Sequence, residues 1–177
     1  VHDVGGDGWG NNQLEFDTDR VDNVSHDGQG NLRIVAREEM FQGNTYTSAR
    51  IKSKGLVEQA YGRFEARIKV PAGAGLWPAF WMLGSNFDDV GWPQTVEIDV
   101  MEFRGQELNI IHSSLHGPGY SAGNAITKTF QLPEGESFAD EFHVYAVDWD
   151  PGRISFSVDG EVYHIINSAD VNAQGDW

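Results

Sequence analysis

The sequence predicts an all-β protein made of two packed antiparallel sheets, as in a β-sandwich or a jelly roll. Three observations support this: hydrophobic residues alternate with period two in several segments, 21 glycines mark frequent turns, and sustained helical periodicity is missing. The chain has 177 residues and shows no internal repeat, linker or low-complexity tract. We therefore expect a single domain over residues 1–177.

The strands follow one another along the chain, separated by glycine and polar turn residues. We expect them at residues 32–36, 47–53, 63–70, 77–83, 96–105, 110–116 and 142–149, with a hairpin over 154–165. The hairpin would turn at Asp159-Gly160, a dipeptide that type I′ turns favour. A two-residue loop there would pair Val158 with Glu161 and Phe156 with Tyr163.

Three carboxylates occur within the predicted strand 96–105. Glu97 and Asp99 alternate with aliphatic residues, so both acids should lie on one face. Glu102 is out of phase and would point into the apolar layer, which is costly. One extra residue, a β-bulge near Val100-Met101, would return Glu102 to the face of the other two. The alternative is an exposed acidic edge strand, but the flanking aliphatic residues favour burial.

Crowded carboxyl groups of this kind suit acid–base chemistry. Because like charges repel, at least one of the three should keep its proton at neutral pH. A carboxylate beside a carboxylic acid is what a retaining glycosidase uses, with the two groups about 5 to 5.5 Å apart. The bulge also indicates a curved sheet, whose concave face would form the substrate cleft.

Aromatic residues near the acidic strand are candidates for binding a sugar. Trp77 and Trp81 share one face of their strand, while Phe80 and Met82 suffice for the core side. We therefore expect both indoles to face the cleft, where pyranose rings stack on such surfaces. Packing of both indoles in the core is the alternative.

Five further residues complete the predicted substrate-binding set. They are Trp9, Asn11, Arg50, Trp92 and His116. Trp9 and Trp92 lie in loops, where aromatic residues often serve recognition. His112, Ser114 and His116 share a polar strand face and should line a wet cleft, and their spacing is not that of a zinc site. A surface strand charge is the alternative for Arg50.

The net charge of −15 and the pI near 4.5 disfavour nucleic acid and anionic membranes as partners, because both select basic patches. A neutral polysaccharide fits better. No stretch approaches the roughly 18 apolar residues of a membrane span. We expect a secreted protein, extracellular or periplasmic, that is a monomer. The chain has no cysteine, so thiols do not indicate its redox compartment.

Two short features near the start of the chain are candidate sites. The acidic residues there are Asp3, Asp7, Asp17, Asp19 and Asp22. Calcium takes oxygen ligands, but these spacings match no calcium-binding loop, and we expect a solvated acidic surface and predict no metal site. Asn23-Val24-Ser25 matches the acceptor sequence for N-glycosylation.

Ordered motifs run through nearly the whole chain. They are Gly8-Trp9-Gly10-Asn11-Asn12, Gly30-Asn31-Leu32, Tyr46-Thr47-Ser48-Ala49-Arg50-Ile51, Tyr61-Gly62-Arg63-Phe64-Glu65, the segment 77–84, Glu97-Ile98-Asp99-Val100-Met101-Glu102, Leu115-His116-Gly117-Pro118-Gly119-Tyr120-Ser121 and His143-Val144-Tyr145-Ala146-Val147. In these motifs the chain resembles glycoside hydrolase family 16, in particular its bacterial laminarinases, which are endo-β-1,3-glucanases.

The resemblance implies a concanavalin A-like β-jelly roll and endo-acting hydrolysis of β-1,3-glucan (laminarin) with retention of configuration. It implies Glu97 as nucleophile, Glu102 as general acid/base, and Asp99 as the residue that orients the nucleophile and tunes its proton. The chemistry would need no cofactor, although relatives often carry one structural calcium. Mixed-linkage β-glucan or agar as substrate, transglycosylation, and a non-catalytic carbohydrate-binding module remain alternatives.

The chain departs from the family at both ends. Members usually have an Asp-Glu-Phe strand before the Gly-Trp-Gly segment and, near the end, Pro-Phe-Phe and Ala-Val-Gly-Gly stretches. None of these is present, so we expect an incomplete catalytic domain. Missing strands would leave unpaired strand edges, which would affect the solubility and the activity of the chain by itself.

Overall fold

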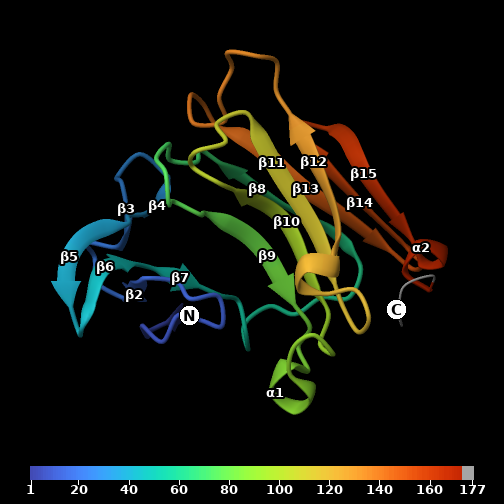
Figure 1. Cartoon of the computed structure of the whole chain (residues 1–177), viewed down its shortest axis with the longest axis horizontal. Coiled ribbons are helices and arrows are strands. Elements are labelled where there is room, and N and C mark those ends of the chain that lie inside the picture. Colours follow the sequence, from blue (N-terminus) through green and yellow to red (C-terminus); the bar gives the residue numbers. More distant parts are fainter. Residues whose placement is uncertain (173–177) are drawn as a thin grey trace. The chain divides into compact units, whose positions relative to one another are not determined.

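The computed structural model describes residues 1–172. The chain divides into two units, Val1–Glu58 and Gln59–Trp177, and both are built from strands joined by turns (Figure 1). The single domain expected over 1–177 stays a prediction. Within the described residues, no helix has the length and apolar composition that crossing a membrane requires.

The first unit contains short strands in three small sheets. β1 (His2–Asp3) pairs with β7 (Arg50–Ile51), β3 (Val24–His26) pairs with β4 (Leu32–Ile34), and β6 (Asn44–Ser48) lies between β2 (Glu15–Asp17) and β5 (Arg37–Phe41). The β2–β6 pair is parallel, whereas the other pairs are antiparallel. The strand predicted at 47–53 is therefore wrong as one element, because it divides between β6 and β7.

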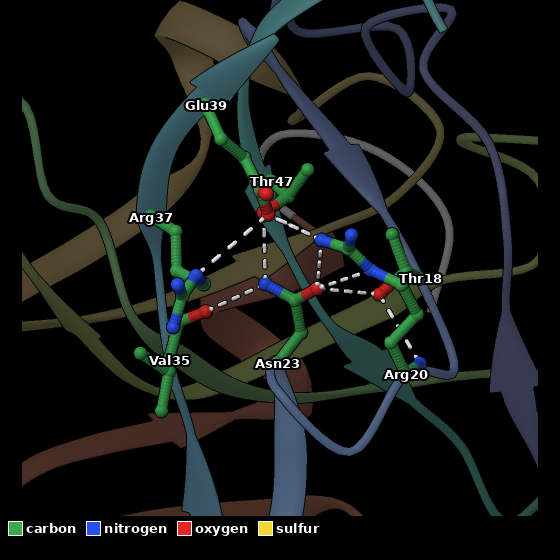
Figure 2. A network of polar contacts seen from close by, with 7 residues as sticks. All are labelled: Thr18, Arg20, Asn23, Val35, Arg37, Glu39 and Thr47. Atoms are coloured by element: carbon green, nitrogen blue, oxygen red, sulfur yellow. Dashed lines mark hydrogen bonds and ion pairs between the residues drawn. The ribbon is translucent and has the colours of Figure 1, made fainter. Parts of the chain in front are cut away.

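A buried polar network centred on Asn23 holds this unit together (Figure 2). Asn23 Oδ1 accepts hydrogen bonds from Thr18 Oγ1 (2.6 Å) and from the Arg20 guanidinium (2.9 Å). Asn23 Nδ2 donates to Val35 O (3.0 Å) and to Thr47 Oγ1 (2.9 Å). Both amide protons are thus used, and the side chain is fully buried. The acceptor sequence at Asn23 is inaccessible to glycosylation in the folded chain.

The charges in this network are paired. Arg20 forms an ion pair with Glu39, whose Oε1 also accepts a hydrogen bond from Thr47 Oγ1 (2.5 Å). Arg37 Nε lies 3.7 Å from the same oxygen (Figure 2). Hydrogen bonds from Thr47 and Arg20 keep the pKa of Glu39 below its ordinary value.

The second unit contains two four-stranded antiparallel sheets, each with its strands side by side in Figure 1. The first has the order β12 (Ile126–Gln131), β11 (Ile110–His116), β10 (Glu97–Phe103) and β9 (Ala79–Leu83). The second has the order β15 (Glu161–Asn167), β14 (Arg153–Val158), β13 (His143–Asp150) and β8 (Gly62–Ile68). The short helices are α1 (Phe87–Val90), η1 (Ala122–Asn124) and α2 (Ser168–Asn172).

One hydrophobic core lies between these sheets. Buried side chains from both contribute to it, such as Phe103 and Ile111 from the first sheet and Val147 and Phe156 from the second. A buried hydrogen bond of 2.8 Å between Ser113 Oγ on β11 and His164 Nδ1 on β15 also joins them. Because strand side chains alternate, the opposite face of β10 is free for polar residues.

The hairpin at Asp159-Gly160 is confirmed, and Val158 pairs with Glu161 as predicted. The predicted Phe156–Tyr163 pair is wrong, because a register shift between Phe156 and Ser157 moves the partner of Phe156 to His164. The rings of Phe156 and His164 stack with their centroids 5.1 Å apart. A bulge adds one residue to one strand, so the pairing beyond it moves by one position.

Candidate active site

The predicted β-bulge in the acidic strand is present. On β10, Asp99 pairs with Ser114 of β11 and Glu102 pairs with His112, so Val100 and Met101 together oppose the single residue between them. The pairing of β10 with β9 shifts at the same place. Val100 and Met101 are both buried in the hydrophobic core.

The bulge brings the three acids to one face of the sheet. Their cross-strand partners on β11 are His116 for Glu97, Ser114 for Asp99 and His112 for Glu102. Since these partners alternate along a regular strand, the acids opposite them share a side. On the other side of β10, Trp81 is the partner of Asp99. The exposed acidic edge strand is thereby excluded, because β10 lies between β9 and β11.

The residue directly before Glu97, at the end of the loop that leads into β10, has a strained backbone conformation. Val96 has φ +62°, a left-handed conformation that costs a β-branched residue of order 1 kcal/mol or more. Hydrogen bonds from Val96 N to Pro93 O (3.1 Å) and from Gly84 N to Val96 O (3.3 Å) maintain it. A Cβ at Gly84 would lie 2.3 Å from Thr95 O, so this close approach requires glycine.

Burial and mutual repulsion disfavour ionisation of the three acids. Burial, followed by the charge of Asp99, raises the pKa of Glu97 to about 7. Burial, followed by the charge of Glu102, raises the pKa of Asp99 to about 7. Burial also raises the pKa of Glu102, although His116 opposes this. The cluster therefore holds protons near neutral pH, as its spacing predicted.

His116 lies close to the middle acid. Its Nε2 is 3.0 Å from Asp99 Oδ2, and its Nδ1 accepts a hydrogen bond of 3.2 Å from the backbone N–H of Ala122. Because Nδ1 accepts, a neutral His116 carries its proton on Nε2, the nitrogen beside Asp99. Asp99 Oδ2 has no hydrogen-bond partner among the described residues, so the contact with His116 is chiefly electrostatic.

Two predicted tryptophans contact the outer acids directly. Trp77 Nε1 donates to Glu102 Oε1 over 3.1 Å, and the side chain of Trp92 hydrogen-bonds Glu97. The Trp92 ring also lies 5.9 Å from the His116 ring, centroid to centroid. Trp77 is 48% exposed and Trp92 is 42% exposed, so each ring keeps a free surface. Trp77 is therefore not core packing, and Trp81 is partly exposed.

The other predicted binding residues belong to the first unit. The Arg50 guanidinium lies 4.8 Å from the centroid of the Trp9 ring, a cation–π contact, and Asp3 Oδ2 lies 3.4 Å from Arg50 Nε. Asn11 is exposed in the adjacent turn. That Trp9, Asn11 and Arg50 act in one site with the acids stays a prediction.

Asp17 contradicts the expected solvated acidic surface. It is 3% exposed, and burial followed by the charge of Glu15 raises its pKa to about 6. Its backbone explains the burial, because N–H and C=O of Asp17 both bond Gly5 in a β-bridge. Asp3 is also paired, with Arg50 and Lys52.

Glu107 is a site neighbour that sequence reasoning missed. His112 Nε2 lies 2.9 Å from Glu107 Oε2, and Arg104 Nη1 lies 3.4 Å from Glu107 Oε1. His112 is the cross-strand partner of Glu102, so Glu107 contacts a neighbour of the general-acid candidate. Glu107 lies in the turn after β10, where no sequence pattern predicts its partner.

Among the described residues, Glu97, Asp99 and His116 place potential metal-ligand atoms within 4.8 Å of one another. Calcium prefers six to eight oxygen ligands, and this group offers only two carboxylates and an imidazole. The group therefore does not fit a calcium site, and a structural calcium elsewhere stays a prediction.

The comparisons with known proteins agree with this geometry. The sequence profile named "Glycosyl hydrolases family 16" matches residues 10–176. A β-glucanase from Rhodothermus marinus is 37% identical over 182 residues, covering 99% of this chain and 62% of that protein. A β-1,3-glucan-binding protein from Penaeus monodon is 38% identical over 125 residues, covering 66% of this chain and 34% of that protein.

A solved structure gives the same result for the fold. The laminarinase catalytic domain from Thermotoga maritima MSB8 matches with a TM-score of 0.94 and 38% identity, covering 100% of this chain and 74% of that chain. The predicted all-β jelly-roll class is thus confirmed. This chain spans less than two thirds of the length of the R. marinus relative. From the profile match and these identities, the chain belongs to glycosyl hydrolases family 16.

Proposed function

We propose that this protein is an endo-acting retaining glycoside hydrolase that cleaves β-1,3-glucan. The observation that carries the proposal is the bulge in β10, which puts Glu97, Asp99 and Glu102 on one sheet face. A binding module needs aromatic rings and polar groups but has no use for three crowded carboxyls with raised pKa values. The names of the T. maritima and R. marinus relatives support the same activity.

In the first step, a Glu97 carboxylate oxygen attacks the anomeric carbon. A bond forms between them while the glycosidic C–O bond breaks, and the departing oxygen takes the proton of Glu102. Glu97 must be ionised for this step and Glu102 protonated. The hydrogen bond from Trp92 favours the ionised form of Glu97, while burial raises the pKa of Glu102 and so favours its protonated form.

In the second step, water replaces the enzyme on the sugar. The Glu102 carboxylate, now without its proton, accepts one from the water, whose oxygen attacks the anomeric carbon. The ester bond to Glu97 breaks, and the product keeps its original anomeric configuration. Asp99 lies on the same strand face as Glu97, and its charge raises the pKa of that carboxyl, so Asp99 tunes the proton of the free nucleophile.

The substrate is taken to be a neutral polymer because the chain carries a charge of −15. Laminarin is the first choice, since a relative's name specifies laminarinase. Because such a polymer does not enter cells intact, we place the protein outside the cytoplasm, and we expect it to act as a monomer.

The test is release of reducing sugar from laminarin by the 177-residue chain and by two variants. We expect Glu97→Gln to lower kcat by about 10⁴-fold or more, because it removes the nucleophile. Glu102→Gln should lose comparable activity on laminarin but much less of the first step on a dinitrophenyl glycoside, whose leaving group needs no proton. Glu161→Gln, at the exposed end of the hairpin, is the matched control and should retain full activity.

The products separate the alternatives. Short β-1,3-oligosaccharides, first formed as the β-anomer, would support the proposal. Preferential cleavage of mixed-linkage glucan or agar would keep the chemistry and change the substrate. Tight laminarin binding with no release by the unmutated chain would instead indicate a non-catalytic module, the function that the P. monodon relative's name describes.

A further inference from the structure

The contact between Trp77 and Glu102 involves a group that can only donate. Indole Nε1–H has no acceptor capacity, and it is bound to Glu102 Oε1 over 3.1 Å. A protonated carboxyl carries its hydrogen on one oxygen. The carbonyl oxygen of a protonated carboxyl is a better acceptor than its hydroxyl oxygen, so the indole N–H favours Oε1 as the carbonyl oxygen and Oε2 as the oxygen that carries the proton.

Backbone contacts fix the position of Trp77. Gly73 N donates to Gly105 O (2.9 Å), and Gly105 N donates to Leu76 O (2.8 Å), so the loop before β9 is bound to the end of β10. A Cβ on Gly105 would lie 2.0 Å from Gly73 O, so only glycine permits this approach. Phe103 N also donates to Pro78 O (3.1 Å), directly after Trp77.

We propose that Trp77 is a positioning residue whose indole N–H occupies Oε1 of Glu102 and thereby confines the acid proton of that carboxyl to Oε2. The inference rests on the proposed function, for which Oε2 would be the oxygen that faces the glycosidic bond. Trp77 then has two separable parts: the ring surface, which is half exposed for stacking, and the N–H, which orients the proton.

In addition to the hydrogen bond from Trp77, several ionisable groups act on Glu102. Glu97 and Asp99 lie on the same strand, and His112 and His116 lie on β11. Glu107 and Arg104 follow behind His112. On β9 the partner of Glu102 is Ala79, which carries no charge. Burial raises the pKa of Glu102, and the Trp77 hydrogen bond is one of the contributions that oppose it.

Trp92 gives an internal comparison, because its side chain hydrogen-bonds the other outer acid, Glu97. Removal of the N–H of Trp77 should act on the alkaline limb of the pH profile of kcat/KM, which reports the acid. Removal of the N–H of Trp92 should act on the acidic limb, which reports the nucleophile. A general loss of structure would not separate the two limbs in this way.

The first experiment needs no turnover. The chain is labelled with ¹³C at the glutamate side-chain carboxyls, Glu102 is assigned with Glu102→Gln, and its titration is followed by NMR in the unmutated chain and in Trp77→Phe. We expect the Glu102 midpoint to move upward by about 0.5 to 1 pH unit, because the ionised form loses a hydrogen bond. Trp149→Phe is the matched control, since Trp149 Nε1 has no hydrogen-bond partner among the described residues.

The second experiment measures kinetics. In Trp77→Phe an aromatic ring remains at this position, so we expect KM for laminarin to change less than about twofold while kcat falls about tenfold. With a dinitrophenyl glycoside, which needs no acid proton, the deficit should shrink to about twofold. Incorporation of β-(3-benzothienyl)alanine at position 77, which keeps the shape of indole and lacks the N–H, should reproduce both results.

An unchanged Glu102 midpoint in both position-77 variants would overturn the inference. A rise in KM alone, with an unchanged kcat, would likewise reduce Trp77 to a stacking surface. If the midpoint moves but no glucan is cleaved by the unmutated chain, the hydrogen bond stands and the proposed function fails. If glucan is cleaved and the midpoint does not move, only the inference fails.

Discussion

The network around Asn23 and the acid cluster around Asp99 are both buried and polar, but their charges are balanced differently. In the network, Arg20 and Glu39 neutralise each other, and the Asn23 amide uses both its donors and its acceptor. In the cluster, three carboxyls share a face with two histidines and accept hydrogen bonds from two indoles. The pKa of Glu39 is lowered, whereas those of all three clustered acids are raised.

The difference shows two roles for buried polar groups: the Asn23 network stabilises the fold, whereas the acid cluster is suited to proton transfer. A network in which every group is satisfied fixes one arrangement of the chain and gains nothing from proton exchange. A cluster in which like charges are held together stores unfavourable energy that proton transfer relieves. The free energy of unfolding, measured as a function of pH, distinguishes the two roles.

The largest effect is expected in the network. Asn23→Ala would leave Thr18, Thr47 and Val35 O without their partner in a buried place, and we expect a loss of about 2–4 kcal/mol in the free energy of unfolding. Urea unfolding followed by circular dichroism measures it. Asn124→Ala, in the exposed turn η1, is the control and should change stability by less than about 0.5 kcal/mol. Equal effects at the two positions would contradict a structural role for the network.

In the acid cluster, neutralisation should stabilise the fold. The pKa of Asp99 is raised from 3.8 to about 7, so the folded chain binds more protons than the unfolded chain in this range. The contribution of the group is complete below pH 3.8 and is lost as the pH rises through 7. Asp99→Asn should therefore be more stable than the unmutated chain by about 1–3 kcal/mol at pH 8, and the difference should disappear near pH 4.

Asp159→Asn is the control with the opposite sign. Burial of Asp159 is outweighed by hydrogen bonds from Val144 N and His143, and its pKa is lowered. Asparagine there should weaken the fold at pH 8, and less so at acidic pH, in parallel urea titrations. Destabilisation of both variants at pH 8 would show that the acid cluster is not under electrostatic strain.

The smallest effect concerns His164, a buried residue that belongs to neither cluster. Burial, followed by the charge of Lys128, lowers its pKa from 6.5 to about 4. Its contribution to stability is present above pH 6.5 and is lost as the pH falls toward 4, because only the unfolded chain takes up the proton. We expect a loss of about 1 kcal/mol, allowing for partial screening by solvent. Thermal unfolding of the unmutated chain and of His164→Gln between pH 7 and 4 should show it only in the former.

The acid face could be predicted from sequence because two local rules conflict there. Alternation places Glu97 and Asp99 on one face. Because burial of Glu102 in the apolar layer would be costly, one extra residue is needed between Asp99 and Glu102. Only a bulge satisfies both rules. The sequence also predicts that Trp77 and Trp81 face the cleft, but it does not predict a hydrogen bond from an indole to an acid, since an indole is equally suited to stacking and to donation.

Other features depended on partners that are distant in the sequence. Asn23 lies next to strand β3, but its partners Val35 and Thr47 are 12 and 24 residues away, so its burial leaves no local pattern. The shift that pairs Phe156 with His164 sits in a hairpin whose alternation looks regular on both sides. Neither the burial of Asn23 nor the register shift at Phe156 disturbs the local alternation of residues, so the sequence pattern does not predict either of them.

The bulge makes the backbone geometry of β10 depend on the number of residues between its acids as well as on their identity. Between Glu97 and Glu102 the chain has one more residue than a regular strand needs for its acids to share a side. Loss of a single codon at Val100 or Met101 would leave a strictly alternating Glu-x-Asp-x-Glu segment, whose three acids share a side in a regular strand without a bulge. A gap of one residue in an alignment of this strand therefore indicates the absence of the bulge and does not by itself indicate the loss of the acid face.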